Sequence, residues 1–201
     1  MRVGLFGGSF DPIHRGHLEP VQEARRDLGL DRVIYLPTAL PPHKPRRRHA
    51  SPWARYAMVE LALLAEEGLF ASAFELTLDR PAYTIDTVEH FRRELPEAEL
   101  HLLVGGDSFA DLPQWFRWRD IVAAVHLAVL ARPGWDLEGE AALPAELAEL
   151  VRGGRVKLLC QPPVAVSSTL LRELLARGEP PPAGWLPDLV LDFIRKYDLY
   201  R

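Results

Sequence analysis

One early stretch, residues 7–17 (GGSFDPIHRGH), restricts the fold of this chain more than any other part of it. It follows a short apolar run, residues 3–6, and leads into a helix-like segment, residues 18–28, that Gly29 closes. In a strand–turn–helix unit, the first helical turn has unpaired N–H groups and the positive end of the helix dipole, and both attract an anion. The stretch therefore predicts an α/β unit with a phosphate site at its turn.

Two residue types inside this stretch suit such a site. Gly7 and Gly8 lack Cβ atoms, so a ligand can lie directly against the backbone. His14 and His17 are three residues apart, so within a first helical turn they share a face and aim at one point. Gly16, which lies between them, keeps that face open. We therefore interpret the turn and the two histidines as one site.

Other interpretations of the two histidines are open at this point. They could be surface residues, or two ligands of a zinc site, which would need a third and a fourth ligand, while the single cysteine, Cys160, is distant in sequence. The glycines do not follow the dinucleotide-binding pattern, and no P-loop or nucleophile-elbow motif occurs. A glycine turn that follows an N-terminal strand and precedes both histidines favours the phosphate site.

Composition limits the class of protein and its partners. A chain of 201 residues with 48% hydrophobic and 26% charged residues is expected to form one domain, 1–201, with a C-terminal helical segment at about 167–201. A net charge of −4 gives no general attraction to nucleic acid or to an anionic membrane, and the apolar runs are too short to span one. One cysteine and the lack of a leader before the first strand favour the cytoplasm, and a homo-oligomer stays open.

Apolar runs alternate with helix-like segments, which is typical of βα units on a parallel sheet. We predict an α/β fold: a Rossmann-like, doubly wound parallel sheet with helices on both faces. The predicted strands are 2–7, 32–37, 70–76, 100–105, 127–131 and 155–160. The predicted helices are 16–28, 52–67, 85–94, 117–124, 143–151, 168–177 and 185–197, and the segment 185–201 is assigned to packing only. In such sheets ligands bind beyond the carboxyl ends of the strands.

Segments that follow the predicted strands carry groups suited to phosphates and planar rings. Lys44 lies in a proline-rich connection and is one of only three lysines, and a compact, flexible ammonium suits a migrating pyrophosphate. Tyr83 and Thr84 precede a helix whose free N–H groups could bind a carboxylate, although a simple helix cap accounts for them as well. Trp115 offers a stacking face for a ring, with core packing as the alternative.

Two further segments complete this set. Gly105 and Asp107 follow the fourth predicted strand, where the carboxylate is well placed to meet a ribose hydroxyl. Ser167 and Ser168 begin a helix after the sixth predicted strand, and hydroxyl residues at that position usually cap the helix. With Arg172 one turn later, they would also make a second phosphate cradle.

Taken in order, these motifs resemble the pattern of bacterial nicotinate-nucleotide adenylyltransferases, within the H-x-G-H nucleotidyltransferase superfamily. The motifs are G-G-S-F-D-P-I-H-x-G-H, P-P-H-K, Y-T-x-D-T, G-G-D-S, L-P-x-W, R-P-G, S-S-T-x-x-R and a closing L-P-x-x-V-x-x-F-I-x-x-x-x-L-Y. The resemblance covers essentially the whole chain. The sequence departs from the pattern at Arg80-Pro81-Ala82, where Gly-Pro-Ser is usual, at Phe116, where Tyr is common, and at Val166, where Ile is common.

The resemblance implies transfer of the AMP moiety of ATP to nicotinate mononucleotide, giving deamido-NAD and pyrophosphate, by direct attack without a covalent enzyme intermediate. It implies Mg²⁺ bound mainly through the substrate phosphates, without a metal site on the protein. The implied catalytic residues are His14, His17, Lys44 and Arg172. The implied ATP-binding residues are Gly7, Gly8, Ser9, Gly16, Gly105, Asp107, Ser167 and Ser168, and nicotinate mononucleotide is expected at Tyr83, Thr84 and Trp115.

Three alternatives compete with this interpretation. Pantetheine-phosphate adenylyltransferases and cytidylyltransferases share H-x-G-H but usually show T-x-D-x-x-H-x-G-H, whereas this chain has Ser9-Phe10-Asp11-Pro12. A nucleotide-binding sensor that has lost catalysis would bind ligand without turnover. A zinc-binding structural module is the third alternative, and metal analysis tests it.

Overall fold

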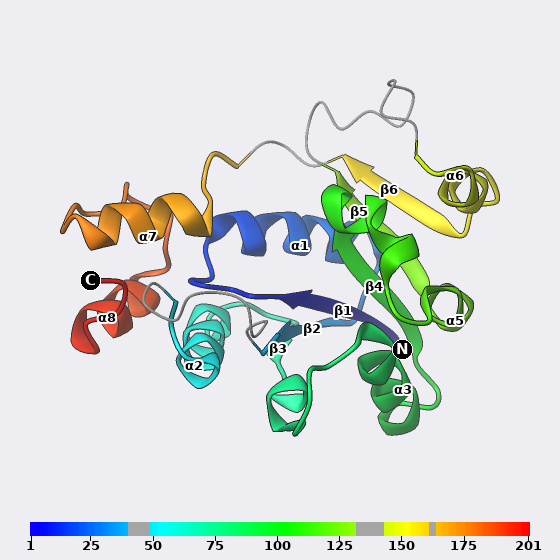
Figure 1. The fold of residues 1–201 in the computed structure, drawn as a ribbon, viewed down its shortest axis with the longest axis horizontal. Coiled ribbons are helices and arrows are strands. Elements are labelled where there is room, and N and C mark those ends of the chain that lie inside the picture. The colour runs from blue at the N-terminus through cyan, green and yellow to red at the C-terminus, as the bar shows by residue number, and fades with distance from the viewer. Residues whose placement is uncertain (40–48, 132–142, 161–163) are drawn as a thin grey trace. The chain divides into compact units, whose positions relative to one another are not determined.

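The computed structural model describes residues 1–39, 49–131, 143–160 and 164–201. Within these residues one sheet has six strands: β1 (Arg2–Gly8), β2 (Arg32–Pro37), β3 (Leu69–Ala71), β4 (Glu99–Gly105), β5 (His126–Ala131) and β6 (Val156–Cys160). The strand order is β3-β2-β1-β4-β5-β6 (Figure 1). β1 pairs with β4, β4 with β5 and β5 with β6, in each case in parallel. The predicted α/β, Rossmann-like parallel sheet is confirmed.

Helices connect the strands. In the described part of the chain they are α1 (Arg15–Leu28), α2 (Pro52–Leu63), α3 (Thr84–Glu94), α4 (Gly106–Ala110), α5 (Trp118–Ala124), α6 (Ala145–Arg152), α7 (Ser168–Ala176) and α8 (Asp188–Lys196). Two short 3₁₀ helices are η2 (Phe74–Thr77) and η3 (Leu112–Gln114). Among the helices of the described ranges, none combines the length and the apolar character that a membrane crossing requires.

The chain divides into two compact units. Unit 1 comprises Met1–Phe6, Pro20–Val33 and Ala82–Pro163, and unit 2 comprises Gly7–Glu19, Ile34–Pro81 and Val164–Arg201. Unit 1 holds most of β1, β4, β5 and β6, together with α3, α4, α5 and α6. Unit 2 holds the glycine turn and the first residues of α1, together with the whole of α2, α7 and α8.

The core of unit 1 is packed tightly where β1 meets β4. A Cβ atom on Gly4 would lie 2.7 Å from Leu103 and 3.0 Å from both Leu30 and Val33, so this strand position has room for no side chain. Leu103 and Val33 are themselves buried. β1 and β4 therefore meet at van der Waals contact, as a dry interior requires.

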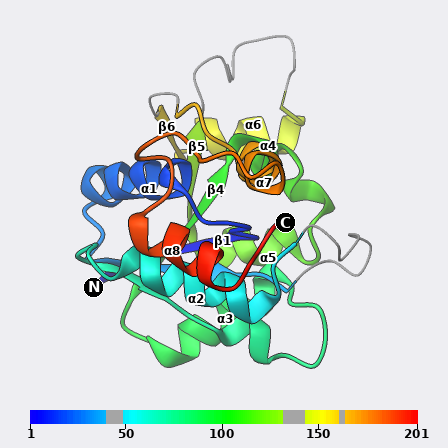
Figure 2. The same cartoon turned by 90° about the vertical axis from the view of Figure 1, so that its left-hand side faces the viewer.

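Unit 2 has its own core, formed by residues around α2. Phe10, Tyr35 and Met58 are fully buried there. α2 packs beside α8 (Figure 2). The predicted start of α2 is confirmed, because the Ser51 side chain accepts a hydrogen bond from the Ala54 N–H at 3.2 Å and proline occupies the first helical position.

The structure corrects several predicted element boundaries. The strand predicted at 70–76 ends at Ala71, because the Ser72 hydroxyl accepts the Phe74 N–H at 3.2 Å and turns the backbone into η2. The last helix begins at Asp188 rather than 185, since Pro187 disfavours a helical conformation in the residue before it. The helix predicted to 67 ends at Leu63, and the sequence did not predict α4 or η3.

Candidate active site

The glycine turn after β1 uses its glycines in two ways. A Cβ atom on Gly8 would lie 2.8 Å from the Phe10 ring, and one on Gly16 would lie 3.0 Å from the His14 ring. These two positions are glycine because neighbouring side chains of unit 2 fill the space. At Gly7 the nearest described atom to such a Cβ is a backbone oxygen 4.0 Å away, so its exposed backbone is open to a ligand.

His14 and His17 form a stacked pair at the start of α1. Their ring centroids are 3.8 Å apart and their planes are inclined by 30°, so the two rings lie side by side, as predicted, although His14 precedes the helix. The His14 N–H donates to Nδ1 of His17 at 3.3 Å, which leaves the proton of the neutral His17 ring on Nε2. His14 is only 5% exposed, whereas His17 is half-buried. His17 therefore presents an N–H donor of the kind that a phosphate oxygen accepts.

Buried aromatic side chains hold His17 in place. The Tyr35 hydroxyl donates to the carbonyl oxygen of His17 at 3.0 Å, and the Phe10 ring meets the His17 ring edge-on at 5.2 Å. Burial, and secondarily the charge of Glu66, raises the pKa of Tyr35 well above its ordinary value. Tyr35 therefore stays protonated and keeps its role as a donor.

The start of α7 is hydrogen-bonded to residues 11–17, the segment that we call the histidine turn. The Ser167 hydroxyl caps α7 by accepting a backbone N–H at 3.2 Å, and the Ser168 hydroxyl donates to the carbonyl oxygen of Pro12 at 3.0 Å. Arg172 donates from Nη1 to the carbonyl oxygen of Asp11 at 2.7 Å. Both serine hydroxyls engage protein groups, and Arg172 also donates from Nη2 to the Thr169 hydroxyl at 3.2 Å. What this segment offers to an anion is therefore the positive charge of Arg172 and the N–H groups at the start of α7 that the Ser167 hydroxyl does not cap.

Asp11 lies at the centre of a set of polar groups that we call the Asp11 cluster: Asp11, His49, Ala50, Arg172 and Tyr200. Asp11 is 1% exposed as a residue. Its Oδ1 accepts the Ala50 N–H at 3.0 Å and the Tyr200 hydroxyl at 2.8 Å. Its Oδ2 contacts Nδ1 of His49 and lies 3.9 Å from Nη1 of Arg172. A buried carboxylate of this kind is stable because donors and cations surround it.

Arg55 joins two chain segments that follow strands. This α2 residue has no exposed surface, yet it carries a guanidinium group. It donates from Nη1 to the carbonyl oxygen of Ser9, and from Nη2 to that of Thr38 at 2.6 Å. Burial lowers the pKa of Arg55, and the Asp11 charge opposes that shift. The residues after β1 and after β2 are therefore fixed to one helix.

In unit 1, the end of β4 presents open backbone beside a carboxylate. A Cβ atom on Gly105 would meet no described atom within 4 Å. Asp107 follows in the first turn of α4 and is exposed. This arrangement suits the predicted contact with a ribose hydroxyl, because a ligand could lie against the Gly105 backbone within reach of the carboxylate.

The start of α3 offers backbone donors. The Tyr83 N–H already donates to Oδ2 of Asp86 at 3.0 Å. Helix geometry leaves the N–H groups of Thr84 and Ile85 without an intrahelical acceptor. A ligand carboxylate at this helix start would therefore meet Thr84 first, since Asp86 occupies the Tyr83 donor.

Tyr83 and Phe116 of unit 1 form an exposed aromatic pair, and Tyr83 directly precedes the Thr84 donor in the sequence. The rings of Tyr83 and Phe116 are 4.9 Å apart and are 49% and 55% exposed as residues. Trp115, which the sequence favoured as the stacking residue, is half-buried and follows η3. The contact between Phe116 and Tyr83 joins positions far apart in the chain, so it has no local signature in the sequence.

The structure groups the predicted residues by unit. Unit 2 contains Gly7, Gly8, Ser9, His14, Gly16, His17, Ser167, Ser168 and Arg172. Unit 1 contains Tyr83, Thr84, Gly105, Asp107 and Trp115. Lys44 lies outside the described residues. Sequence reasoning did not assign the polar roles of Asp11, His49, Arg55 and Tyr200, although Asp11 and Tyr200 both stand inside the quoted motifs.

In the described ranges, no three His, Cys, Asp or Glu side chains come together as metal ligands. The Asp11 carboxylate in particular has protein donors on both oxygens. Its surroundings therefore suit a fixed structural anion rather than an open metal ligand.

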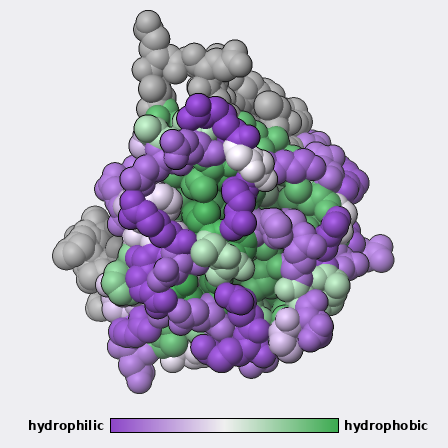
Figure 3. Space-filling model, turned by 90° about the vertical axis from the view of Figure 1, so that its right-hand side faces the viewer, coloured by the Kyte–Doolittle hydropathy of each residue, from purple (hydrophilic) through white to green (hydrophobic). Residues whose placement is uncertain are grey.

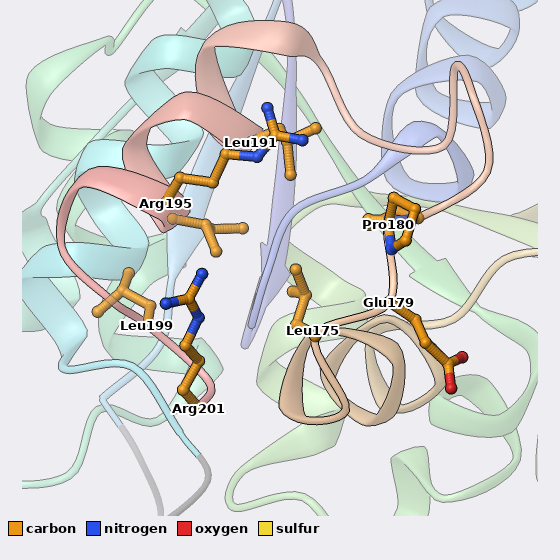
Figure 4. A pocket seen from close by; sticks show the side chains of 10 residues that line it. Leu175, Glu179, Pro180, Leu191, Arg195, Leu199 and Arg201 are labelled. Atoms are coloured by element: carbon orange, nitrogen blue, oxygen red, sulfur yellow. The ribbon is translucent and has the colours of Figure 1, made fainter.

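Two cavities lie elsewhere on the units. One of about 450 Å³ lies where β4 and β5 begin, with Glu99, His126 and Arg155 among its lining residues. Figure 3 shows apolar residues gathered within a hydrophilic rim on the side where Figure 1 labels α5 and α6. The second cavity, of about 110 Å³, lies in unit 2. It is lined by residues of α7 and α8, of the segment between them and of the segment after α8 (Figure 4). Neither includes the histidine turn.

Comparisons with known proteins show to which family this chain is similar. A family model described as cytidylyltransferase-like matches residues 5–174. The chain is 42% identical to a probable nicotinate-nucleotide adenylyltransferase of Aeromonas hydrophila over 217 aligned residues, which cover 99% of this chain and 97% of that protein. It is 40% identical to a protein of the same description from Gloeobacter violaceus, with coverage of 99% and 96%.

A solved structure extends the likeness to the fold. The nicotinic acid mononucleotide adenylyltransferase of Plasmodium falciparum, solved in complex with NaAD, matches with a TM-score of 0.75 over 99% of this chain and 97% of that chain. The two sequences are 16% identical, so this comparison supports the fold alone.

Proposed function

We propose that this chain, which belongs to the nicotinate-nucleotide adenylyltransferase family, transfers the adenylyl group of ATP to nicotinate mononucleotide in NAD biosynthesis. The products are deamido-NAD and pyrophosphate. The observation that carries the proposal for the site is the stacked pair of His14 and His17, joined to the start of α7 through Arg172 and Ser168. Residues 1–201 act as one nucleotidyltransferase domain, and the single cysteine favours the cytoplasm.

The reaction is a direct displacement at phosphorus. A phosphate oxygen of nicotinate mononucleotide forms a bond to the α-phosphorus of ATP, the bond from that phosphorus to the bridging oxygen breaks, and pyrophosphate leaves with the electron pair. No covalent enzyme intermediate forms. The described residues of unit 2 supply hydrogen-bond donors and positive charge, so catalysis rests on positioning and charge stabilisation.

The histidine pair, the glycine turn and the start of α7, all in unit 2, have separate roles in this step. His17 donates from Nε2 to an α-phosphate oxygen as negative charge develops. His14 holds the His17 ring by stacking against it and by donating its backbone N–H to Nδ1. The open backbone at Gly7 and the exposed Ser9 line the path of the phosphates. Arg172 and the first turn of α7, with its Ser167 cap, attract the departing pyrophosphate.

Two further components belong to the proposal. Lys44 acts as a second cation on the pyrophosphate. Mg²⁺ would be held mainly through the substrate phosphates, as is usual in phosphoryl-transfer sites, and it would supply positive charge that neutralises the leaving pyrophosphate.

In unit 1 the proposal assigns the adenosine and the pyridine ring. Asp107 accepts a ribose hydroxyl beside the open Gly105 backbone. The nicotinate carboxylate meets the Thr84 N–H, with Tyr83 beside it, and the ring stacks on Trp115.

Backbone donors give a specificity argument. A nicotinamide amide turned the wrong way would point donors at the Thr84 N–H, and each buried group left unpaired costs about 1–3 kcal/mol. We therefore expect kcat/KM for nicotinate mononucleotide to exceed that for nicotinamide mononucleotide. Equal efficiency with both would remove the carboxylate pocket from the proposal.

The test is pyrophosphate release from ATP and Mg²⁺, measured in parallel with nicotinate mononucleotide, nicotinamide mononucleotide and phosphopantetheine. Rapid release with the first acceptor alone supports the reaction and the pocket together. Release with a different acceptor keeps the chemistry and overturns the pocket. No release with any acceptor, despite tight binding of ATP, would support a nucleotide sensor instead.

A further inference from the structure

The Tyr200 side chain reaches from the segment after α8 to the histidine turn of the same unit. Its hydroxyl donates to Oδ1 of Asp11 at 2.8 Å, across 189 positions of sequence. Burial, followed by the charge of Asp11 and their hydrogen bond, raises the pKa of Tyr200 far above its ordinary value. The hydroxyl therefore keeps its proton and acts only as a donor to the carboxylate.

Both oxygens of the Asp11 carboxylate engage protein groups. Oδ1 accepts from Ala50 and Tyr200, and Oδ2 contacts His49 with Arg172 at 3.9 Å. Both oxygens thus have protein partners, and the side chain is 2% exposed. A role as general base or metal ligand does not fit this environment, whereas a role in fixing its neighbours does.

What Asp11 fixes is the proposed catalytic apparatus. Its carbonyl oxygen accepts the Nη1 donor of Arg172 at 2.7 Å, and that of Pro12 accepts the Ser168 hydroxyl at 3.0 Å. His14, which lies two residues after Pro12 in the same turn, stacks on His17. A shift of Asp11 therefore moves Arg172 and the histidine pair relative to one another.

The backbone at Tyr200 gives independent support. Its φ is +70°, in the left-handed region that a bulky residue rarely adopts, and Asp198 has φ +51°. Such a conformation persists where surrounding contacts hold it. The neighbouring Leu199 and Arg201 line the cavity shared with α7 and α8 (Figure 4), and Leu199 donates its N–H to Ile194 at 3.0 Å. The segment is thus folded back so that the Tyr200 hydroxyl meets Asp11.

We propose that Tyr200 is a positioning residue for adenylyl transfer: through the Asp11 carboxylate, its hydroxyl holds Arg172 and the His14–His17 turn in the geometry that the reaction needs. This inference rests on the proposed function. It differs from a purely structural role of the C-terminal segment, which would affect stability and leave turnover unchanged.

The test compares Tyr200→Phe with Tyr197→Phe. Both substitutions remove one hydroxyl from the same segment, but Tyr197 is exposed and packs its ring on Phe193. For Tyr200→Phe we expect kcat with nicotinate mononucleotide to fall about tenfold, with KM for that acceptor unchanged, at a temperature where melting curves show both variants folded. Tyr197→Phe keeps wild-type kcat. Wild-type kcat in Tyr200→Phe overturns the proposal, whatever happens to its melting temperature.

A double-mutant cycle tests whether Tyr200 acts through Asp11. Asp11→Asn keeps the side-chain volume and removes the charge. If the path runs through Asp11, adding Tyr200→Phe to Asp11→Asn lowers kcat no further. Full additivity of the two losses contradicts that path, and wild-type kcat in a folded Asp11→Asn overturns the proposal even where Tyr200→Phe does not fold.

A binding measurement separates this inference from the proposed function. Calorimetry with inorganic pyrophosphate reports on Arg172 without turnover. If the wild type releases no pyrophosphate with any acceptor, the proposed function fails, and the affinity for inorganic pyrophosphate decides about Tyr200. Weaker binding by Tyr200→Phe than by Tyr197→Phe then supports the positioning role, and equal affinity overturns it.

Discussion

At the scale of single residues, His17 combines a defined tautomer with a rigid support. Nδ1 accepts from His14, and the carbonyl oxygen accepts from Tyr35, so the ring is held before a substrate arrives. A preorganised donor costs no reorganisation when charge develops on a phosphate oxygen. The donor on Nε2 is therefore expected to matter in the transition state more than in substrate binding.

For His17→Ala we expect a loss of about 10²-fold in kcat, with a smaller change in KM, by analogy with removal of one transition-state donor. Steady-state pyrophosphate release measures both parameters. His90→Ala, a histidine of α3 in unit 1, is the control and keeps wild-type kinetics. A His17→Ala variant with near-normal kcat would exclude the assigned role.

The two kinds of glycine make a second prediction at this scale. Since a Cβ on Gly105 meets no described atom within 4 Å, Gly105→Ala is expected to keep the melting temperature. The added methyl group lies where the nucleotide is proposed to approach, so KM for ATP should rise about tenfold. Gly8→Ala is the counterpart: its Cβ would lie 2.8 Å from Phe10 and should lower the melting temperature. An unchanged KM for ATP in Gly105→Ala would move the nucleotide away from this strand end.

At the scale of elements, α2 acts as a brace for two strand ends. Its Arg55 guanidinium binds the carbonyl oxygens of Ser9 and Thr38, which follow β1 and β2. A buried cation with two backbone acceptors and a nearby carboxylate is costly to remove, because its partners stay buried without it.

Arg55→Met is expected to lower the free energy of unfolding by about 3 kcal/mol or more, measured by urea denaturation. Arg119→Met is the matched control, since Arg119 is exposed and pairs with Glu146 at 2.9 Å on the surface. Loss of an exposed ion pair of this kind costs about 0–1 kcal/mol. Equal losses in the free energy of unfolding would show that Arg55 contributes no more to stability than an exposed ion pair does.

The elements also show what a sequence can and cannot predict here. β1, the glycine turn and the start of α2 were predictable because an apolar run, a cap at Ser51 and Pro52 act over a few residues. β3 was predicted too long, because the Ser72 side chain competes locally with the strand. The strand-end rule pointed to the segments that contain His17 and Arg172. No local pattern, however, distinguishes Tyr200, bound to Asp11, from an ordinary residue packed after a helix.

At the scale of the whole molecule, charge at the amino ends of the strands in unit 1 makes stability depend on pH. The rings of His101 and His126 stack at 5.0 Å, and Glu99 pairs with both, while Arg2 also contacts Glu99. Burial, and then the charge of His126, lowers the pKa of His101 below its ordinary value of 6.5. The folded protein therefore holds His101 neutral where the unfolded chain protonates it.

The unfolded state consequently binds more protons as pH falls below about 6.5, and the free energy of unfolding should decrease from pH 7 toward pH 5. His101→Gln lacks this titration and should lose less stability over the same interval, as measured by urea denaturation at each pH. For Glu99, burial raises the pKa, but Arg2 and the two histidines outweigh it and hold the pKa below 4.5, so its contribution is lost only at lower pH. Parallel curves for the two proteins between pH 7 and pH 5 would contradict this assignment.

The hydrogen bond between Tyr200 and Asp11 joins positions 189 residues apart. On a ribosome, the histidine turn is made early, yet the carboxylate at its base receives one of its donors only after residue 200 has left the exit tunnel. A contact that closes so long a loop forms late, once most of the chain is ordered. A product of interrupted translation would therefore carry the complete histidine motif and still lack a finished phosphate site.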